Sequence, residues 1–468
     1  MQLLRTVVTT LALIASASIA MAAEAPLRAG VATVDITPPV PFRMCGYFYE
    51  RLSTGVKDPL FARAIVFRQG KESAALVFCD IIGAPASVAT PARKKASELT
   101  GIPVEHIAVA GTHTHTGPLF FTSLSDYFHE RAVAKHGKDP YDAAPYVDEL
   151  TSKIADAIVR ANAAAAPVEL KSGYAIEEHV SFNRRYHMKD GTVRWNPPTQ
   201  SPDIVRPAGP IDPQIGVILL SKPGAKQPAS AIVSFAMHLD TTSGTLYSAD
   251  YVKSLDDRLR QSFGPDFTLL FGTGTCGNIN HRDVSKQEQR NADTIGPILG
   301  DDVVNAIAAG AIVADGAPDL AIRSTKVAAP LQEYREDEVA EARADMPKVG
   351  TRDLAFMPSV EACKILDVER LKRLGNPLQL EVQAFRLNND TAIVTLPSEI
   401  FVEFGLAIKA ASPFKTTLVV ELTNDDVAYI PTKQAFVEGA YEVANSRVVP
   451  GTGEKLVEAA VGLLKELK

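Results

Sequence analysis

The chain has 468 residues, of which 46% are hydrophobic and 22% are charged, and its formal net charge is −7. This composition is typical of a globular protein and excludes a disordered or fibrous chain. The mild negative charge, without any run of Lys and Arg, argues against a nucleic-acid-binding surface. The four cysteines show no Cys-x-x-Cys spacing, which excludes a disulfide-dense scaffold and a cysteine-built zinc ribbon but leaves one or two disulfides open.

The first 22 residues have the pattern of a secretory signal peptide. Arg5 is the only charged residue before Glu24, and an apolar, small-residue run extends from Thr6 to Ala20. An Ala-x-Ala cleavage site follows, and the run is shorter than the ~20 residues that span a bilayer. The sequence therefore predicts a signal peptide at residues 1–22 and a mature, secreted or periplasmic chain at residues 23–468.

Short apolar runs in the rest of the chain alternate with helical patterns. Six runs are apolar or β-branched without alternation, which is typical of buried strands. These predicted strands are Ala74–Phe78, His106–Ala110, Ala231–Ala236, Phe267–Phe271, Thr391–Leu396 and Thr416–Leu422.

Helical spacing recurs between the predicted strands. Val147, Leu150, Ile154 and Ile158 mark one helix, and Leu255 and Leu259 mark another. Glu333–Ala344 is charged on nearly every side and predicts a solvated surface helix, whereas Arg185–Arg194, with Asp-Gly near its middle, predicts an exposed hairpin.

The sequence contains no internal repeat, low-complexity tract or Pro/Ser-rich linker. The length alone allows two or three domains. The simplest prediction is instead an α/β fold with one large domain of mixed β-sheet and flanking helices.

Polar residues follow four of the predicted strands. His113 and His115 come after His106–Ala110 in a Gly-Thr-His-Thr-His-Thr-Gly-Pro segment, and extended residues i and i+2 face the same side. His238, Glu399 and Tyr429 follow three other strands. Ligands in open α/β sheets bind beyond the carboxyl ends of strands. Two imidazoles, a carboxylate and a phenol suit Zn²⁺, so the sequence predicts a metal site at these strand ends.

Each residue has a simpler structural explanation when it is taken alone. A single His-x-His occurs by chance, His238 could be a core histidine, Glu399 could begin a helix, and Tyr429 could be a core aromatic. Three other hydrolase classes do not fit. A metallo-β-lactamase-like site needs Asp-His where Thr116 and Gly117 stand, an amidohydrolase barrel needs an eightfold repeat, and a serine hydrolase needs Gly-x-Ser-x-Gly.

A series of blocks, in order across about 410 residues, resembles the neutral/alkaline (non-lysosomal) ceramidases. The opening resembles that family at Ala29–Pro39, Cys45–Tyr47 and Asp58–Ala64. Gly111–Pro118 is similar to the family's His-Thr-His-Ser-Gly-Pro signature, with Thr116 in place of Ser. The remaining similarities are Asn183-Arg184, Phe235–His238, Leu396–Glu399, Tyr429–Thr432 and Tyr441-Glu442.

The resemblance implies a zinc-dependent amidase that cleaves the N-acyl bond of ceramide through a zinc-activated water. The metal ligands carried over from the family are His113, His238, Glu399 and Tyr429. His115 and Arg184 would hydrogen-bond the developing oxyanion, and Tyr441 is a candidate donor to the oxyanion or the leaving amine. Asp250 is a candidate partner for a zinc-bound histidine.

Three departures from the family bear on the substrate. We expect no C-terminal β-sandwich domain, because the chain stops about 27 residues after Tyr441. The family's Gly-Asp-Val-Ser-Pro-Asn block is Gly277–Arg282 here, with Asn280 in place of the Ser, which favours a water nucleophile. Phe436 replaces a tyrosine of the pocket, and the charged region Glu333–Arg373 could reshape the entrance.

Three functions stay open on the sequence. The first is a ceramide-like N-acyl lipid as substrate, with transient contact to a membrane surface. The second is the same zinc site acting on a small amide, ester, lactone or glycoconjugate. The third is a zinc-stabilised binding protein without turnover, which would need neither His115 nor Arg184. The sequence does not determine the oligomeric state.

Overall fold

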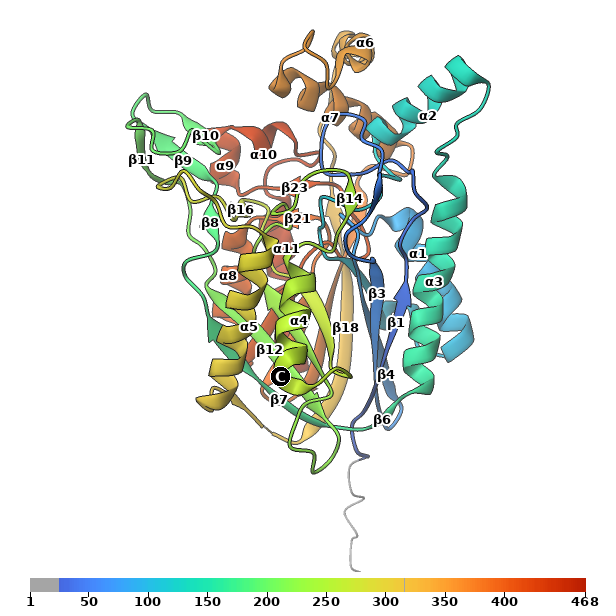
Figure 1. The fold of residues 1–468 in the computed structure, drawn as a ribbon, viewed down its shortest axis with the longest axis vertical. Coiled ribbons are helices and arrows are strands. Elements are labelled where there is room, and N and C mark those ends of the chain that lie inside the picture. Colours follow the sequence, from blue (N-terminus) through green and yellow to red (C-terminus); the bar gives the residue numbers. More distant parts are fainter. Residues whose placement is uncertain (1–24, 315) are drawn as a thin grey trace, which may run out of the picture.

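Three β-sheets face one another around a shared apolar core in the computed structural model, which describes residues 25–314 and 316–468 (Figure 1). The first sheet has the order β5 (Ile107–Gly111), β4 (Glu72–Cys79), β3 (Phe61–Gln69), β1 (Arg28–Asp35) and β6 (Ala166–Pro167). The second has the order β15 (Thr268–Thr273), β13 (Ser230–Phe235), β12 (Gln214–Ser221), β7 (Glu169–Ile176) and β17 (Ile312–Val313). The third has the order β18 (Pro318–Ala329), β19 (Leu378–Asn388), β20 (Thr391–Thr395) and β22 (Thr416–Val420).

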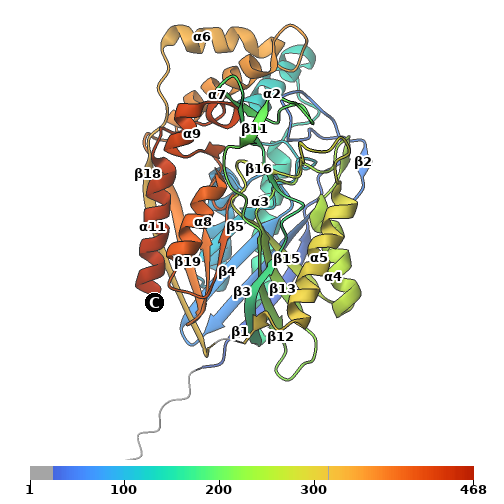
Figure 2. The same ribbon diagram turned by 90° about the vertical axis from the view of Figure 1, so that its left-hand side faces the viewer.

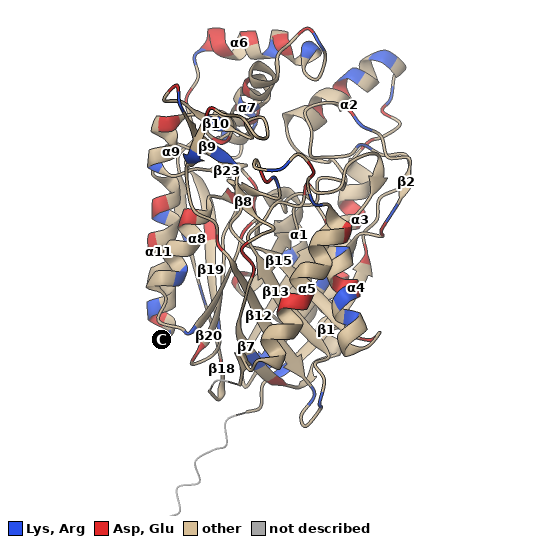
Figure 3. Ribbon diagram, turned by 60° about the vertical axis from the view of Figure 1, so that its left-hand side comes forward, with Lys and Arg blue, Asp and Glu red and all other residues tan. Residues whose placement is uncertain are grey.

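Helices cover the outer face of each sheet (Figures 1 and 2). The first sheet is covered by α1 (Ala86–Thr100) and α3 (Ala144–Ala163), and the second by α4 (Tyr251–Phe263) and α5 (Ala292–Ala308). The third is covered by α8 (Val402–Ala411) and α11 (Thr452–Leu467). Figure 3 shows that charged residues lie mainly on such outer helices and on loops.

The central strands are buried on both faces, which explains their unbroken apolar sequence. In β4, Ala75, Val77 and Cys79 pack toward the helices, whereas Leu76 and Phe78 pack into the core between the sheets. Successive side chains of a strand point to opposite faces, so both sets must be apolar when both faces are covered.

Each of the three sheets contains one parallel pair of strands joined by a crossover helix. These units are β4–α1–β5, β13–α4–β15 and β20–α8–β22, while the other pairings in the three sheets are antiparallel. A parallel pair needs a crossover because its strands must start at the same edge.

One end of the molecule carries further helices. Figure 1 shows α2 (Ser123–His136), α6 (Glu336–Asp345) and α7 (Phe356–Lys372) together at the top of the view. Single turns η1 (Val104–His106) and η2 (Met346–Lys348) and the short helices α9 (Lys433–Glu438) and α10 (Tyr441–Ala444) complete the helices of the described chain. The small sheets are β10 (Val193–Trp195) with β9 (Arg185–Met188) and β11 (Ile204–Pro207), β14 (Leu246–Tyr247) with β2 (Gly55–Val56), β16 (Ile279–Asn280) with β8 (Phe182–Asn183), and β21 (Glu399–Ile400) with β23 (Tyr429–Ile430).

The structure confirms the single α/β domain and the elements expected from the sequence. The six predicted strands correspond to β4, β5, β13, β15, β20 and β22, and the two predicted helices correspond to α3 and α4. The predicted surface helix is α6, in which only Ala342 is buried. The hairpin pairs β9 with β10 as predicted, but it is not exposed throughout, because Arg185, Tyr186 and Met188 of β9 are buried.

Other expectations have different outcomes. All four cysteines are buried free thiols, so the disulfides that the sequence left open are not formed. The predicted signal peptide lies outside the described residues. Within the described chain, no helix combines the length and the apolar character needed to span a membrane.

Candidate metal centre

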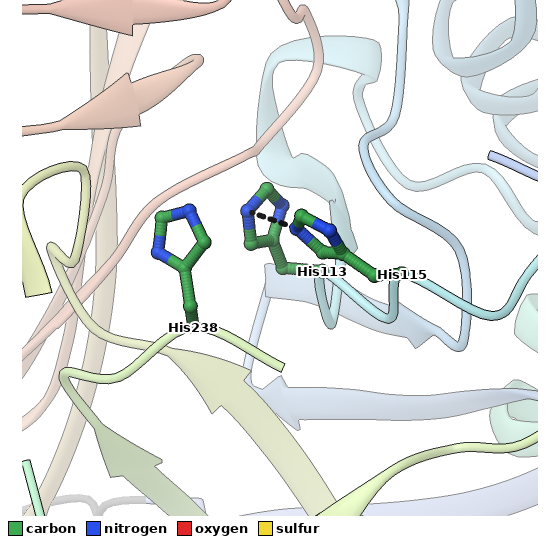
Figure 4. Close-up of side chains that lie close together, drawn as sticks. All are labelled: His113, His115 and His238. Carbon is green, nitrogen blue, oxygen red and sulfur yellow. Dashed lines mark hydrogen bonds between the residues drawn. The ribbon is translucent and has the colours of Figure 1, made fainter. Parts of the chain in front are cut away.

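Three imidazoles converge at one point, although they come from two different sheets (Figure 4). His113 and His115 follow the end of β5, and His238 follows the end of β13. Their ligand nitrogens all lie within 4.8 Å of one another. Backbone contacts hold the two loops together, since the His115 amide donates to the Leu239 carbonyl. The sheets thus place a group of three metal-competent nitrogens in the interior of the protein.

Two of the imidazoles are oriented by backbone carbonyls. The Nδ1 atom of His113 lies 2.8 Å from the Ile82 oxygen, and Nδ1 of His238 lies 2.9 Å from the Cys276 oxygen. A carbonyl only accepts hydrogen bonds, so each Nδ1 carries a hydrogen and, in a neutral ring, Nε2 carries the lone pair. This arrangement is typical of histidines that bind a metal through Nε2.

Glu399 completes the group with a carboxylate. Its Oε2 atom lies 3.3 Å from Nε2 of His113 and 3.3 Å from Nε2 of His238. The residue is 8% exposed, and Oε2 has no hydrogen-bond partner among the residues that the structure describes. A buried carboxylate oxygen without a hydrogen bond costs free energy unless a cation compensates it. The donor set of two oriented Nε2 atoms and this oxygen therefore fits a divalent metal ion.

The electrostatics of the metal-free group follow from burial and from this carboxylate. Burial lowers the pKa of His115 to about 3 and that of His238 to about 4, with nearby positive charge adding to the effect. Burial also opposes protonation of His113, but Glu399 outweighs it and raises the His113 pKa to about 9. The pKa of Glu399 is held well below its usual range by His113 despite burial. Without a metal, the group thus holds an ionised Glu399, neutral His115 and His238, and a protonated His113 whose proton a bound metal ion would displace.

The backbone around the group is strained. His113 has a φ of 75°, and the residues that directly precede Glu399, Tyr429 and Tyr441 also have positive φ: Ser398 at 67°, Ala428 at 58° and Ala440 at 78°. Residues other than glycine rarely adopt this conformation, and strained residues concentrate at functional sites. The strain therefore coincides with the residues that the sequence singled out.

Tyr429 and Tyr441 also lie close to the group. Tyr429 pairs with Glu399 in the β21–β23 ladder, and its ring lies parallel to that of His238 at 6.4 Å. The Tyr441 ring packs at 5.5 Å from Tyr429. Burial raises the Tyr441 pKa to about 12, so its hydroxyl keeps its proton at neutral pH. The place of Tyr429 in a coordination shell stays a prediction.

Arg184 is fully engaged by protein partners. Its Nε donates to Glu442 at 2.8 Å, Nη2 donates to the Gly277 carbonyl at 2.7 Å, and Nη1 lies 3.0 Å from Nε2 of His238. Glu442 is completely buried and also accepts from Arg185. The guanidinium is therefore fixed beside the imidazoles, 5.3 Å from the Tyr429 ring.

A cavity of about 140 Å³ opens onto the group. His113, His115, Glu399, Tyr429 and Tyr441 line one part of it. The remaining wall mixes apolar side chains with charged ones, including Phe48, Leu119, Phe121, Leu371, Asp367, Arg370, Asp426 and Arg447.

The sequence missed part of this site. The expectation for Asp250 is wrong: its carboxylate accepts from Thr241, Thr242 and Tyr251 at the start of α4, and backbone carbonyls orient the histidines instead. The sequence did not predict that α7 forms part of the cavity wall; it marked only the charged region Glu333–Arg373, which contains α7, as one that could reshape the entrance. Other lining residues, such as Phe48 and Phe121, carry no pattern that marks them.

Comparison with known proteins identifies the fold. No model of a protein family and no curated protein matches the chain. A crystal structure of neutral ceramidase from Pseudomonas aeruginosa matches with a TM-score of 0.68 and 19% identity, covering 94% of this chain and 75% of that one. A structure described as ceramidase complexed with C2 matches with a TM-score of 0.69 and 18% identity, covering 95% and 75%. The chain therefore has the fold seen in neutral ceramidase structures.

Proposed function

We propose that the chain is a zinc-dependent amidase that hydrolyses the N-acyl bond of ceramide-like lipids. The observation that carries this proposal is the Glu399 oxygen, which is buried without a hydrogen bond between Nε2 of His113 and Nε2 of His238. This group opens into a cavity in a fold shared with neutral ceramidase structures.

The proposed ligands are His113, His238, Glu399 and Tyr429, beyond the carboxyl ends of β5, β13, β20 and β22. Nitrogen and oxygen donors of this kind suit Zn²⁺. When bound, the metal would polarise the amide carbonyl and lower the pKa of a water molecule toward ~7. The structure favours His113 and His238 over His115 as ligands, because only these two contact Glu399 and have Nδ1 on a backbone carbonyl.

Three other residues would serve the reaction. His115 lines the cavity, with its Nε2 atom 3.4 Å from that of His113, and it would hydrogen-bond the oxyanion that develops beside the metal. Amide hydrolysis breaks the C–N bond, and the leaving nitrogen must take up a proton. Tyr441 holds a proton at the cavity wall and is the proposed donor. Arg184 would stabilise negative charge that develops on the carbonyl oxygen, as a fixed cation in a buried site.

A second candidate function is supported by the cavity wall. Asp367, Arg370, Asp426 and Arg447 contribute charged groups to it, whereas a binding site for hydrocarbon chains is expected to be mostly apolar. The lining is otherwise mostly apolar, so these four charged groups are the feature that would suit a smaller or more polar amide, ester, lactone or glycoconjugate at the same metal site. A zinc-stabilised binding protein without turnover is the third and weakest candidate.

The experiment combines metal analysis with a substrate panel. Purified chain should contain about one zinc per molecule and hydrolyse a short-chain fluorescent ceramide faster than small soluble amides and lactones. His238→Ala should lose both zinc and activity, because it opens the coordination shell. A folded, metal-free protein that is unaffected by zinc would refute the metal-dependent activity. Hydrolysis of small amides or lactones without any of ceramide would establish the second candidate instead.

We also propose that the chain is exported, because residues 1–22 have the pattern of a signal peptide. Its mature form would then begin near Ala23, and it would meet lipid substrates at a membrane surface. Amino-terminal sequencing of protein from the periplasm or medium tests this proposal, and an intact Met1 on the exported protein would contradict it.

A further inference from the structure

The carboxylate of Asp367 links the helices α2 and α7, which contribute to the cavity wall, to the segment that carries Tyr441. Asp367, on α7, is 2% exposed. Its Oδ1 atom accepts a hydrogen bond of 2.6 Å from the amide of Ser123, the first residue of α2. Its Oδ2 atom accepts one of 2.5 Å from Nη2 of Arg447, which lies just beyond α10. The carboxylate is thus fully occupied and fixed between three segments.

The chain of hydrogen bonds continues from Arg447 to the tyrosine. Nη1 of Arg447 donates to Oδ1 of Asn445 at 2.6 Å, and Nδ2 of Asn445 donates to the Tyr441 hydroxyl at 3.3 Å. All four residues line the cavity, and all four are at most 9% exposed. A continuous series of buried hydrogen bonds therefore runs from α7 to the hydroxyl of Tyr441.

This series has a consequence for the tyrosine proton. A hydroxyl has one hydrogen to donate and two lone pairs that accept. Because Asn445 donates to the Tyr441 oxygen, the hydrogen of Tyr441 must point away from Asn445, and the tyrosine lines the same cavity as Glu399 and His113. Asn445 cannot rotate its amide without losing the bond from Arg447, and Asp367 holds Arg447 in place.

We infer that Asp367 is a positioning residue for Tyr441, which it orients through Arg447 and Asn445 so that the tyrosine donates its proton into the cavity. The inference rests on the proposed function for the role of that proton. It assigns to α7, which lies outside the three sheets, a part in the reaction as well as in the cavity wall.

The first test removes either the negative charge of Asp367 or the amide donor of Asn445 by substitutions that preserve the size of the side chain. Asp367→Asn keeps an acceptor for the Ser123 amide but weakens the hold on Arg447. Asn445→Asp keeps the acceptor for Arg447 but turns the donor to Tyr441 into an acceptor. Each should lower kcat about tenfold, as expected for one charge-assisted hydrogen bond, with KM and zinc content unchanged. The matched control is Glu361→Gln, which removes an ion pair of α7 with Lys364 outside the cavity and should leave kcat unchanged.

The second test is a double-mutant cycle with Tyr441→Phe. A positioning role predicts that Asp367→Asn costs no further activity once the tyrosine hydroxyl is gone, because the two changes remove the same contribution. A purely structural role predicts that the two losses multiply. Multiplied losses, or an unchanged kcat in both Asp367→Asn and Asn445→Asp, would overturn the inference.

A readout without turnover distinguishes this inference from the proposed function. Trp195 is the only tryptophan of the chain, and its ring lies 4.7 Å from that of Tyr441. Asp367→Asn should change the Trp195 emission of the folded protein, whereas Glu361→Gln should not. If the wild-type protein cleaves no N-acyl substrate, the proposed function fails, and the Trp195 emission alone then tests whether Asp367 positions Tyr441. Identical spectra of wild type and Asp367→Asn would then overturn the positioning role.

Discussion

Glu399→Gln is the substitution that most directly tests the metal centre. The amide has nearly the same volume as the carboxylate, so the packing around β21 and β23 is preserved. It removes the only carboxylate that contacts Nε2 of His113 and Nε2 of His238. Without the metal, the amide nitrogen can donate to an imidazole lone pair, so the folded state should tolerate the change. The loss should therefore fall on metal binding.

The size of the effect follows from linkage. Zinc at a thousandfold excess over its Kd stabilises a protein by about 4 kcal/mol if only the folded state binds it. An unfolding entropy of about 2.1 cal/mol/K per residue gives about 1 kcal/mol/K for a chain of 468 residues. Zinc should then raise the Tm of the wild-type protein by about 4 °C. Glu399→Gln should remove this shift.

The assay is thermal unfolding with and without zinc, combined with metal analysis after desalting. His115→Ala should keep both the shift and about one zinc per chain, while its activity falls. Glu403→Gln is the matched control, because this nearby carboxylate of α8 accepts from Asn278 and does not face the imidazoles. The assignment of ligands is wrong if Glu399→Gln still binds one zinc, or if His115→Ala loses it.

Arg184→Met should lower the Tm of the metal-free protein by about 3 °C. The completely buried Glu442 would keep only Arg185 as an ion-pair partner, and breaking a buried pair costs about 3 kcal/mol or more. An unchanged Tm would refute the importance of the Arg184–Glu442 pair. Burial and Glu177 raise the pKa of Asp302 to about 7, so the folded state favours the protonated acid. The stability that protonated Asp302 contributes is fully present below about pH 4 and is lost as the pH rises through 7. Asp302→Asn should therefore increase the free energy of unfolding at pH 8, measured by urea unfolding. The increase should be less than about 2 kcal/mol, because solvent screens the partly exposed pair. A recovery that is equal at pH 5 would contradict this sign. Every cysteine is buried and unpaired, so a thiol-reactive disulfide reagent should label no cysteine of the native protein and all four cysteines of the denatured protein. Fewer than four labelled cysteines after denaturation would indicate a disulfide.

The predictable strands are those that are buried on both faces, and they include β22 at the edge of its sheet. Ala74–Phe78 and Thr416–Leu422 were recognisable because a strand covered on both faces must be apolar throughout. The long strand β18 carries exposed and half-buried positions over Pro318–Ala329, so its sequence shows no such run. Its pairing with β19, rather than its own composition, makes it a strand.

The residues of the candidate site also include some that the sequence could predict and some that it could not. A histidine or a carboxylate directly after an apolar run is visible in the sequence, because the chain must leave the sheet where the run ends. That is why His113, His238 and Glu399 could be singled out. The role of Asp250 was wrong because an aspartate before a helix caps that helix through local hydrogen bonds, as it does at α4.

The residue order alone determined the chemistry that the chain can offer: which segments are buried strands, and which metal-competent side chains stand at their ends. The tertiary structure alone decided that the Glu399 oxygen lies 3.3 Å from two imidazoles that belong to other sheets. It also decided that Asp367, from a helix outside those sheets, reaches the neighbourhood of Tyr441. The physical reason is that distances between segments far apart in the chain are set by the packing of three sheets around one core, which no local pattern records.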